Sequence, residues 1–205
     1  MGELHISKKH LLDLVRTDCN ALGEYGYIIG DKPLGFELLK IDGSVYRYFS
    51  DGLKQDREIV LEAVKSRGIV LGAVPNELKY DEEIILAAIN SSKEALKYVP
   101  VDVPNYRELA LKIVADNGEN LEFVSTDSPD YEEIACVALD KAYCAFNFSD
   151  YDMLSIDDPH AAEFRVNEYY SILSKIPEDK QSTILQQLDS KYSEKIEEVK
   201  SRATR

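Results

Sequence analysis

The chain has 205 residues, of which 44% are hydrophobic and 30% charged, a length and composition typical of a soluble protein that can bury a core. Its net charge of −14 is spread along the chain, and such a surface repels phosphate backbones, so we expect no nucleic-acid partner. No stretch approaches the roughly 18 apolar residues of a membrane span, so we expect no membrane association.

A period of 25 residues runs through most of the chain. The phrase "DREIVLEAVKSRG" begins at Asp56, and "DEEIILAAINSSK" begins 25 residues later at Asp81. The same shift aligns a glutamate column, whose members are Glu58, Glu83, Glu108 and Glu133. Apolar columns follow it, and one of them contains Leu61, Leu86, Leu111 and Cys136. We count six copies, which start near residues 7, 31, 56, 81, 106 and 131.

Each copy is predicted to begin with a helix of about three turns. Its apolar residues, such as Val60, Leu61 and Val64, have helical spacing and do not alternate. An acidic first turn favours a helix start because it faces the positive end of the helix dipole. The predicted N-cap residues are Asp31, Asp56, Asp81, Asn105 and Asp130.

The end of each copy predicts a glycine turn and a short helix. The predicted C-cap glycines are Gly43, Gly68 and Gly118. An apolar pair such as Leu71 and Val74 then suits one helical turn. Neither helix can bury its apolar face alone, so copies must stack. The sequence therefore predicts an all-α fold, an α-solenoid of about 25-residue helix–turn–short-helix repeats over residues 7–150. A leucine-rich repeat competes on period, but its L-x-L-x-x-N strand signature is absent.

Residues 151–205 lose the period and predict a C-terminal helical hairpin. The first apolar stripe is Ala162, Val166, Tyr169, Leu173 and Ile176. Pro177 opens the second helix. Its stripe is Leu185, Leu188, Tyr192, Ile196 and Val199. The hairpin can close the last repeat as a cap, or it can form a homodimer.

The copies resemble the helical repeat known as domain of unknown function 4116. The phrase "DREIVLEAVKSRGIVLGAV" shows its acidic start, its hydrophobic run ending in Ala-Val and its glycine. In "DEEIILAAINSSKEALKYV", Lys93 replaces the glycine. The resemblance covers about residues 7–150 and implies no activity. It implies a bacterial source. We expect a cytoplasmic location, and the resemblance adds the alternative of secretion into a host cell without a classical signal peptide.

Residues for catalysis or metal binding form no motif in this sequence. Cys19, Cys136 and Cys144 make no C-x-x-C pair, and the three histidines make no H-x-x-x-H pair. An odd cysteine number without such a pair is typical of a reducing compartment. There is also no G-x-S-x-G elbow and no glycine-rich phosphate loop. We therefore expect neither a cofactor nor an enzyme.

Candidate partner-binding residues are those that differ between copies or begin the long helices. Tyr80, Tyr106 and Tyr131 lie at helix starts, where loops meet the surface. The column after the cap varies most in kind, and it contains Lys32, Arg57, Glu82, Arg107 and Glu132. These residues favour a non-enzymatic protein–protein interaction scaffold. The alternatives are an accessory or targeting module of a secreted effector or larger enzyme, and a small-molecule-binding protein.

Overall fold

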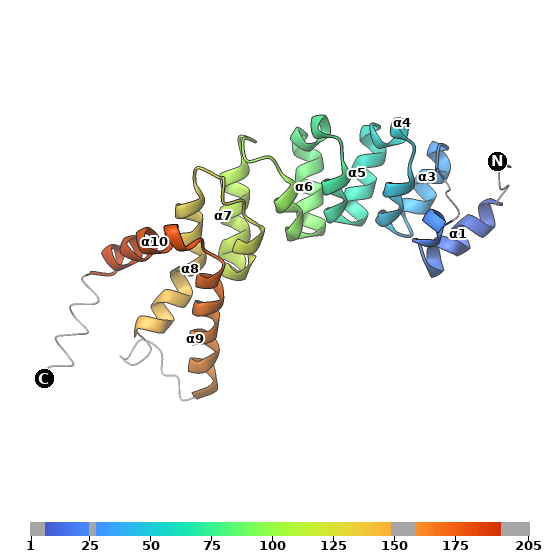
Figure 1. Cartoon of the computed structure of the whole chain (residues 1–205). Helices are drawn as coiled ribbons and strands as arrows, with labels where there is room; N and C mark the ends of the chain where they lie inside the picture. Colours follow the sequence, from blue (N-terminus) through green and yellow to red (C-terminus); the bar gives the residue numbers. More distant parts are fainter. Residues whose placement is uncertain (1–6, 25–27, 149–158, 194–205) are drawn as a thin grey trace, which may run out of the picture. The chain divides into compact units, whose positions relative to one another are not determined.

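In a computed structural model, the chain is all-α, as the sequence predicts (Figure 1). The structure describes residues 7–24, 28–148 and 159–193. Within these ranges the one β feature is an isolated bridge between Ile29 and Phe49. The chain divides into two compact units, unit 1 ending at Val103 and unit 2 beginning at Pro104. None of the described helices has the length and apolarity that a membrane crossing requires.

From residue 32 onward, unit 1 repeats one α-helix and one 3-10 helix (η) with a period of 25 residues, whereas its first copy has two α-helices. Its α-helices are α1 (Lys8–Thr17), α2 (Ala21–Glu24), α3 (Lys32–Leu39), α4 (Asp51–Lys54), α5 (Arg57–Ser66) and α6 (Glu82–Ser91). Its 3-10 helices are η1 (Gly43–Tyr48), η2 (Gly68–Ala73), η3 (Asn76–Tyr80) and η4 (Lys93–Tyr98). Figure 1 shows α3, α5 and α6 side by side, and α5 packs against both neighbours. The short α4 and η3, which the sequence did not predict, lie in the loops between copies.

The predicted aspartate caps start the helices of unit 1. The Asp31 carboxylate accepts from the Leu34 N–H at 3.1 Å. Asp56 caps α5 through Glu58 N–H at 3.0 Å. Asp81 caps α6 in the same way. Each bond satisfies a backbone donor that has no partner within its own helix.

The prediction of a capping side chain fails for Asn105 in unit 2. This residue precedes α7 (Tyr106–Asp116) and makes no side-chain cap hydrogen bond. Its backbone has φ −101° and ψ 10°, whereas the capping aspartates have the extended conformation of an N-cap. The helix therefore begins at the predicted place without the predicted bond.

The repeat glycines are not C-caps, which corrects the sequence interpretation. Gly68 is the first residue of η2, and the C-cap of α5 is Arg67, in an extended conformation with φ −151°. What requires glycine is a close approach between copies. A Cβ on Gly68 would lie 2.2 Å from the backbone oxygen of Ala88 on α6. Gly43 approaches Ala63 in the same way, with a Cβ–oxygen distance of 2.9 Å.

The core of unit 1 consists of the faces that neighbouring copies turn toward each other. On α5 this face is fully buried, and its residues are Ile59, Val60, Ala63 and Val64. The adjoining leucine column was predicted to be core, and this was wrong. Leu61 is half-buried and Leu86 is 39% exposed, because position 61 lies about 100° around the helix from Val60, away from the buried stripe.

Unit 2 joins the last two copies to the C-terminal hairpin. Its elements are α7, η5 (Gly118–Phe123), α8 (Tyr131–Phe148), α9 (Pro159–Ser174) and α10 (Glu178–Lys191). Tyr143 stands in the glycine column of the sixth copy, and there α8 continues without a break into a helix of 18 residues. Both α9 and α10 pack against α8.

The hairpin buries its apolar face against the repeats of its own unit. Its buried residues are Tyr169, Ile172, Ile176, Ile184 and Leu188. Leu173 and Leu185 of the predicted stripes are half-buried, while the side chains of Ala162 and Val166, and all of Ile196 and Val199, lie outside the described residues. This packing is compatible with the predicted cap, and the homodimer stays a prediction. The division into a repeat array over residues 7–150 and a hairpin over residues 151–205 stays a prediction.

Candidate functional site: the helix-start edge

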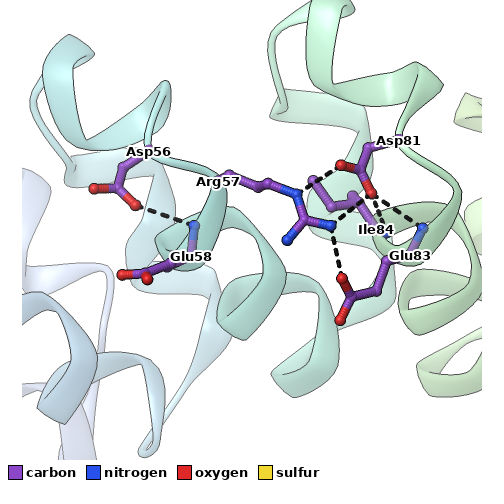
Figure 2. A network of polar contacts seen from close by, with 6 residues as sticks. All are labelled: Asp56, Arg57, Glu58, Asp81, Glu83 and Ile84. Carbon is purple, nitrogen blue, oxygen red and sulfur yellow. Dashed lines mark hydrogen bonds and ion pairs between the residues drawn. The ribbon is translucent and has the colours of Figure 1, made fainter.

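Ion pairs connect the first turns of successive long helices, a surface that we call the helix-start edge. Figure 2 shows the pair between α5 and α6. The Arg57 guanidinium donates to both Asp81 oxygens, at 2.7 and 3.1 Å, and to Glu83 Oε2 at 2.6 Å. Asp81 also accepts from the Glu83 N–H at 3.0 Å, so one carboxylate both caps α6 and pairs with the preceding copy.

The same arrangement recurs in each unit. Between α3 and α5, the Lys32 Nζ lies 2.7 Å from an oxygen of Asp56 and 2.7 Å from one of Glu58. In unit 2, Arg107 on α7 donates from two nitrogens to the Glu133 carboxylate at the start of α8. Three members of the glutamate column, predicted to stabilise their own helix dipoles, thus also accept from the copy before them: Glu58, Glu83 and Glu133.

These pairs hold the carboxylates in their ionised form. The hydrogen bond from Arg57 lowers the pKa of Asp81, and the hydrogen bond from Lys32 lowers the pKa of Asp56. The hydrogen bond from Arg107 lowers the pKa of Glu133. A carboxylate with a lowered pKa is a poor proton donor or acceptor near neutral pH, so the geometry suits stacking of copies and not acid–base catalysis.

The column after the cap therefore splits into two classes. Arg57 and Arg107 are engaged with the next copy, which makes them poor candidates for partner binding. Glu82 is exposed and Glu132 is half-buried, and in the part of the chain that the structure describes neither makes an ion pair. The sequence signal for the pairs was present, because each base lies 26 residues before its glutamate.

The three candidate tyrosines occupy different environments. Tyr80 is 52% exposed and donates to Asp102 Oδ1 at 3.1 Å. Tyr106 and Tyr131 are 2% and 1% exposed, so the expectation of surface side chains was wrong for both. Tyr106 Oη accepts from the Ser125 N–H at 2.9 Å. The reason is register: these two residues stand in the cap column and begin the helix, whereas Tyr80 precedes its cap.

An exposed leucine marks a hollow that the sequence analysis missed. Leu86 lines a depression of about 440 Å³ on α5 and α6. The other lining residues are Lys65, Glu83, Ala87, Asn90 and Ser91. Leu86 and the 39% exposed Tyr98 are large apolar side chains at the surface of unit 1. Sequence reasoning missed Leu86 because its column was assigned to the core.

A larger hollow of about 760 Å³ lies in unit 2 beside α7, α8 and α9. Its floor includes Val114, Val137 and Ala138, and its rim is acidic. Two of the rim carboxylates already have partners inside the unit. Glu119 pairs with Lys175, and Asp140 accepts from Lys191 Nζ at 2.6 Å and from Tyr192 Oη at 2.8 Å. These bonds reduce the capacity of the hollow to hold a cationic ligand.

The cysteines have the environment of structural thiols. The Cys136 thiol lies 3.0 Å from Gln187 Oε1, and burial raises its pKa, which disfavours the nucleophilic thiolate. Burial also raises the pKa of Cys19. The side chain of Cys144 lies outside the described residues. Among the residues described, no group of three or more His, Cys, Asp or Glu side chains is placed to hold a metal ion.

Two adjacent segments, residues 36–79 and 81–128, match the family described as Domain of unknown function (DUF4116). The resemblance drawn from the repeated phrases is confirmed over these segments. No curated protein and no solved structure matches the chain.

Proposed function

We propose that the chain is a non-enzymatic scaffold, built as a helical solenoid, that binds another protein through side chains that differ between its copies. The observation that carries the proposal is the exposure of Leu86 over the hollow on α5 and α6. Exposed apolar side chains next to polar rims are typical of protein interfaces.

The roles of the repeated residues support this proposal. The cap aspartates, the paired glutamates and the glycines are used in joining copies. A residue with such a role cannot change without loss of stacking, so it is unavailable for recognition. The exposed Leu86 has no such role, and together with the exposed parts of Tyr80 and Tyr98 it supplies the kind of contact area that anchors a partner.

The alternatives differ in how the scaffold is used. An accessory or targeting module would bind its partner through the same surface while the activity resides elsewhere. A small-molecule-binding role needs a hollow with polar groups that converge on a ligand. In the unit 2 hollow, Asp140 and Glu119 already pair with lysines, which makes this role less favoured than the scaffold. We propose a cytoplasmic location, with secretion into a host cell as the alternative that the family resemblance suggests.

The test is affinity capture with the intact protein, followed by quantitative mass spectrometry. The variant Leu86→Ser removes the apolar anchor at an exposed position. Val137→Ser is the matched control, because Val137 is an apolar residue of similar exposure, 37%, on a helix of unit 2. Circular dichroism establishes that both variants fold.

We expect a set of proteins that wild type and Val137→Ser retain and Leu86→Ser loses. The interaction is then reconstituted with purified partner, and its Kd is measured for the three chains. Capture of the same proteins by Leu86→Ser, with unchanged Kd, would contradict the assignment of this surface. A chain that turns over a substrate in the absence of any other protein would contradict the scaffold role.

A further inference from the structure

Two arginines in unit 1, Arg47 and Arg67, form no ion pair in the described residues, although Asp42 lies close enough to Arg67 to interact with its charge. Arg16, Arg57 and Arg107 each form an ion pair with an aspartate or a glutamate. In the described ranges, no carboxylate oxygen lies within 4.0 Å of Arg47 or Arg67. This is unexpected in a chain with 38 acidic and 24 basic residues, where a carboxylate is the most available neighbour.

The two arginines are held beside one groove by the same residue. The groove, which we call the Ser44 groove, has a volume of about 220 Å³. It is lined by Ser44, Tyr46, Arg47, Arg67, Ile69, Val70 and Ala73. Arg67 Nη1 donates to the Ser44 hydroxyl at 2.5 Å, and Arg47 Nε donates to the Ser44 carbonyl at 3.2 Å. Ser44 itself is only 4% exposed, so the anchor is fixed.

Each guanidinium keeps most of its donors for a ligand. A guanidinium has five N–H donors in a planar fork, and the bonds to Ser44 use one from each arginine. Two like charges beside one groove repel each other, and an anion between them relieves that repulsion. Arg47 is further oriented by the Tyr48 ring, whose centroid lies 5.8 Å from the guanidinium carbon. Asp42 accepts from the Ser44 N–H at 2.8 Å. Burial alone would raise the pKa of the Asp42 carboxyl, but hydrogen bonds and the charge of Arg67 lower it, so Asp42 offsets part of the positive charge without an ion pair within 4.0 Å in the described residues.

The groove belongs to one pair of copies and is not a feature of the repeat. The column of Arg67 reads Asp42, Arg67, Ser92 and Asn117. The column of Arg47 reads Arg47, Gly72, Lys97 and Glu122. The two arginines therefore meet only where the second copy packs on the third. Residues that serve stacking recur, so a pair that does not recur needs another reason.

We infer that the Ser44 groove binds a carboxylate side chain of an acidic peptide segment in a partner protein. The arginines match a carboxylate in charge and in fork geometry, and the apolar wall of Ile69, Val70 and Ala73 accommodates a neighbouring apolar side chain. The volume suits one or two side chains and is below that of most small-molecule pockets. This inference deepens the proposed scaffold function by naming the chemistry of one partner segment.

The test uses the full chain and a short fluorescein-labelled peptide of alternating Glu and Leu. Fluorescence anisotropy gives its Kd at about 0.15 M salt, where long-range repulsion by the acidic surface is screened. The comparison peptide carries Gln in place of Glu, and inorganic phosphate is titrated separately. The protein variants are Arg47→Gln/Arg67→Gln and the control Arg16→Gln. NMR of the arginine Nε–Hε groups on wild type reports binding without any substitution.

We expect the double variant to bind the Glu peptide with a Kd about tenfold or more higher than that of wild type, and Arg16→Gln to bind it with an unchanged Kd. The Gln peptide should bind wild type as weakly as the Glu peptide binds the double variant. On addition of the Glu peptide to wild type, the Nε–Hε signals of Arg47 and Arg67 should shift, while that of Arg57 should not. Equal affinity for both peptides, an unchanged Kd in the double variant, or phosphate binding at least as tight as the Glu peptide would overturn the inference. If the double variant does not fold, the wild-type NMR titration decides alone.

Failure here is distinguishable from failure of the scaffold proposal. Capture of partners that depend on Leu86 but not on the two arginines would refute the Ser44 groove and retain the scaffold. Capture that depends neither on Leu86 nor on the two arginines would refute both the scaffold proposal and the Ser44 groove.

Discussion

Replacing Gly68 with alanine should destabilise unit 1 by about 1–3 kcal/mol, the cost of overpacking a well-packed interface. The added Cβ would lie 2.2 Å from the backbone oxygen of Ala88 in α6 and 2.9 Å from the backbone nitrogen of Ser92, the C-cap of that helix. An ordinary carbon–oxygen contact is about 3.3–3.6 Å, so α6 has to move away by about 1 Å. That movement also stretches the bond from the Gly68 N–H to the Ser91 hydroxyl, now 3.1 Å.

Two further glycines serve as graded controls. Gly52 in α4 has open space where a Cβ would go, so Gly52→Ala should leave stability unchanged or raise it by up to about 1 kcal/mol. A Cβ on Gly72 would meet the Tyr98 ring at 2.9 Å. That ring is exposed and can swing away, so Gly72→Ala should cost less than Gly68→Ala.

The assay is urea denaturation followed by circular dichroism, together with hydrogen exchange of the α5 and α6 peptides. Hydrogen exchange is needed because two compact units need not unfold in a single transition. Protection of α6 should fall in Gly68→Ala alone among the three variants. A Gly68→Ala chain as stable and as protected as Gly52→Ala would refute the close-approach explanation.

Three other predictions concern the pairs and the buried tyrosines. Arg57→Gln should lower the thermal midpoint of unit 1 at low salt. The difference from wild type should shrink at about 1 M NaCl, because salt screens exposed charges. A difference in midpoint that salt does not change would contradict an ionic origin. Tyr106→Phe should cost about 1–2 kcal/mol, because the half-buried Ser125 loses the acceptor of its N–H. Tyr131→Phe should cost less, because its hydroxyl bond is 3.5 Å long, and equal urea midpoints for the two variants would count against this. Because the pKa of Asp81 is lowered in the folded chain, its pairing stabilises the fold above about pH 4. This stabilisation is lost as the pH falls through the folded-state pKa, so the urea midpoint should drop between about pH 7 and pH 3. The drop should be smaller in Asp81→Asn.

The period and the helix starts could be predicted because they depend on residues close together in the chain. An aspartate three positions before a backbone donor caps a helix by local geometry, and the starts of α3, α5 and α6 follow from that. The helical spacing of the apolar residues is also local, and it predicted the all-α fold.

The errors concern residues whose role depends on the next copy. Gly68 was assigned to its own helix end, but a backbone oxygen in the following copy decides its identity. Leu86 was assigned to the core because sequence spacing alone does not say which of two adjacent apolar columns faces a neighbour. Tyr106 was placed at the surface because its position in the loop suggested exposure, whereas its ring fills the cap column. The Ser44 groove was missed since it needs two residues from different copies.

The joints between copies have a consequence for how such a chain changes its length. Removing residues 57–81 would place Glu82 and Glu83 directly after Asp56, where Arg57 and Glu58 now stand. Lys32 would then keep an aspartate and a glutamate as acceptors, and Gly43 would face Ala88 in place of Ala63. This copy can thus be lost in one genetic step while the new joint keeps a base opposite two carboxylates and a glycine opposite a backbone oxygen. A copy that begins with a base after its cap can therefore be removed without redesign of the interface that replaces it.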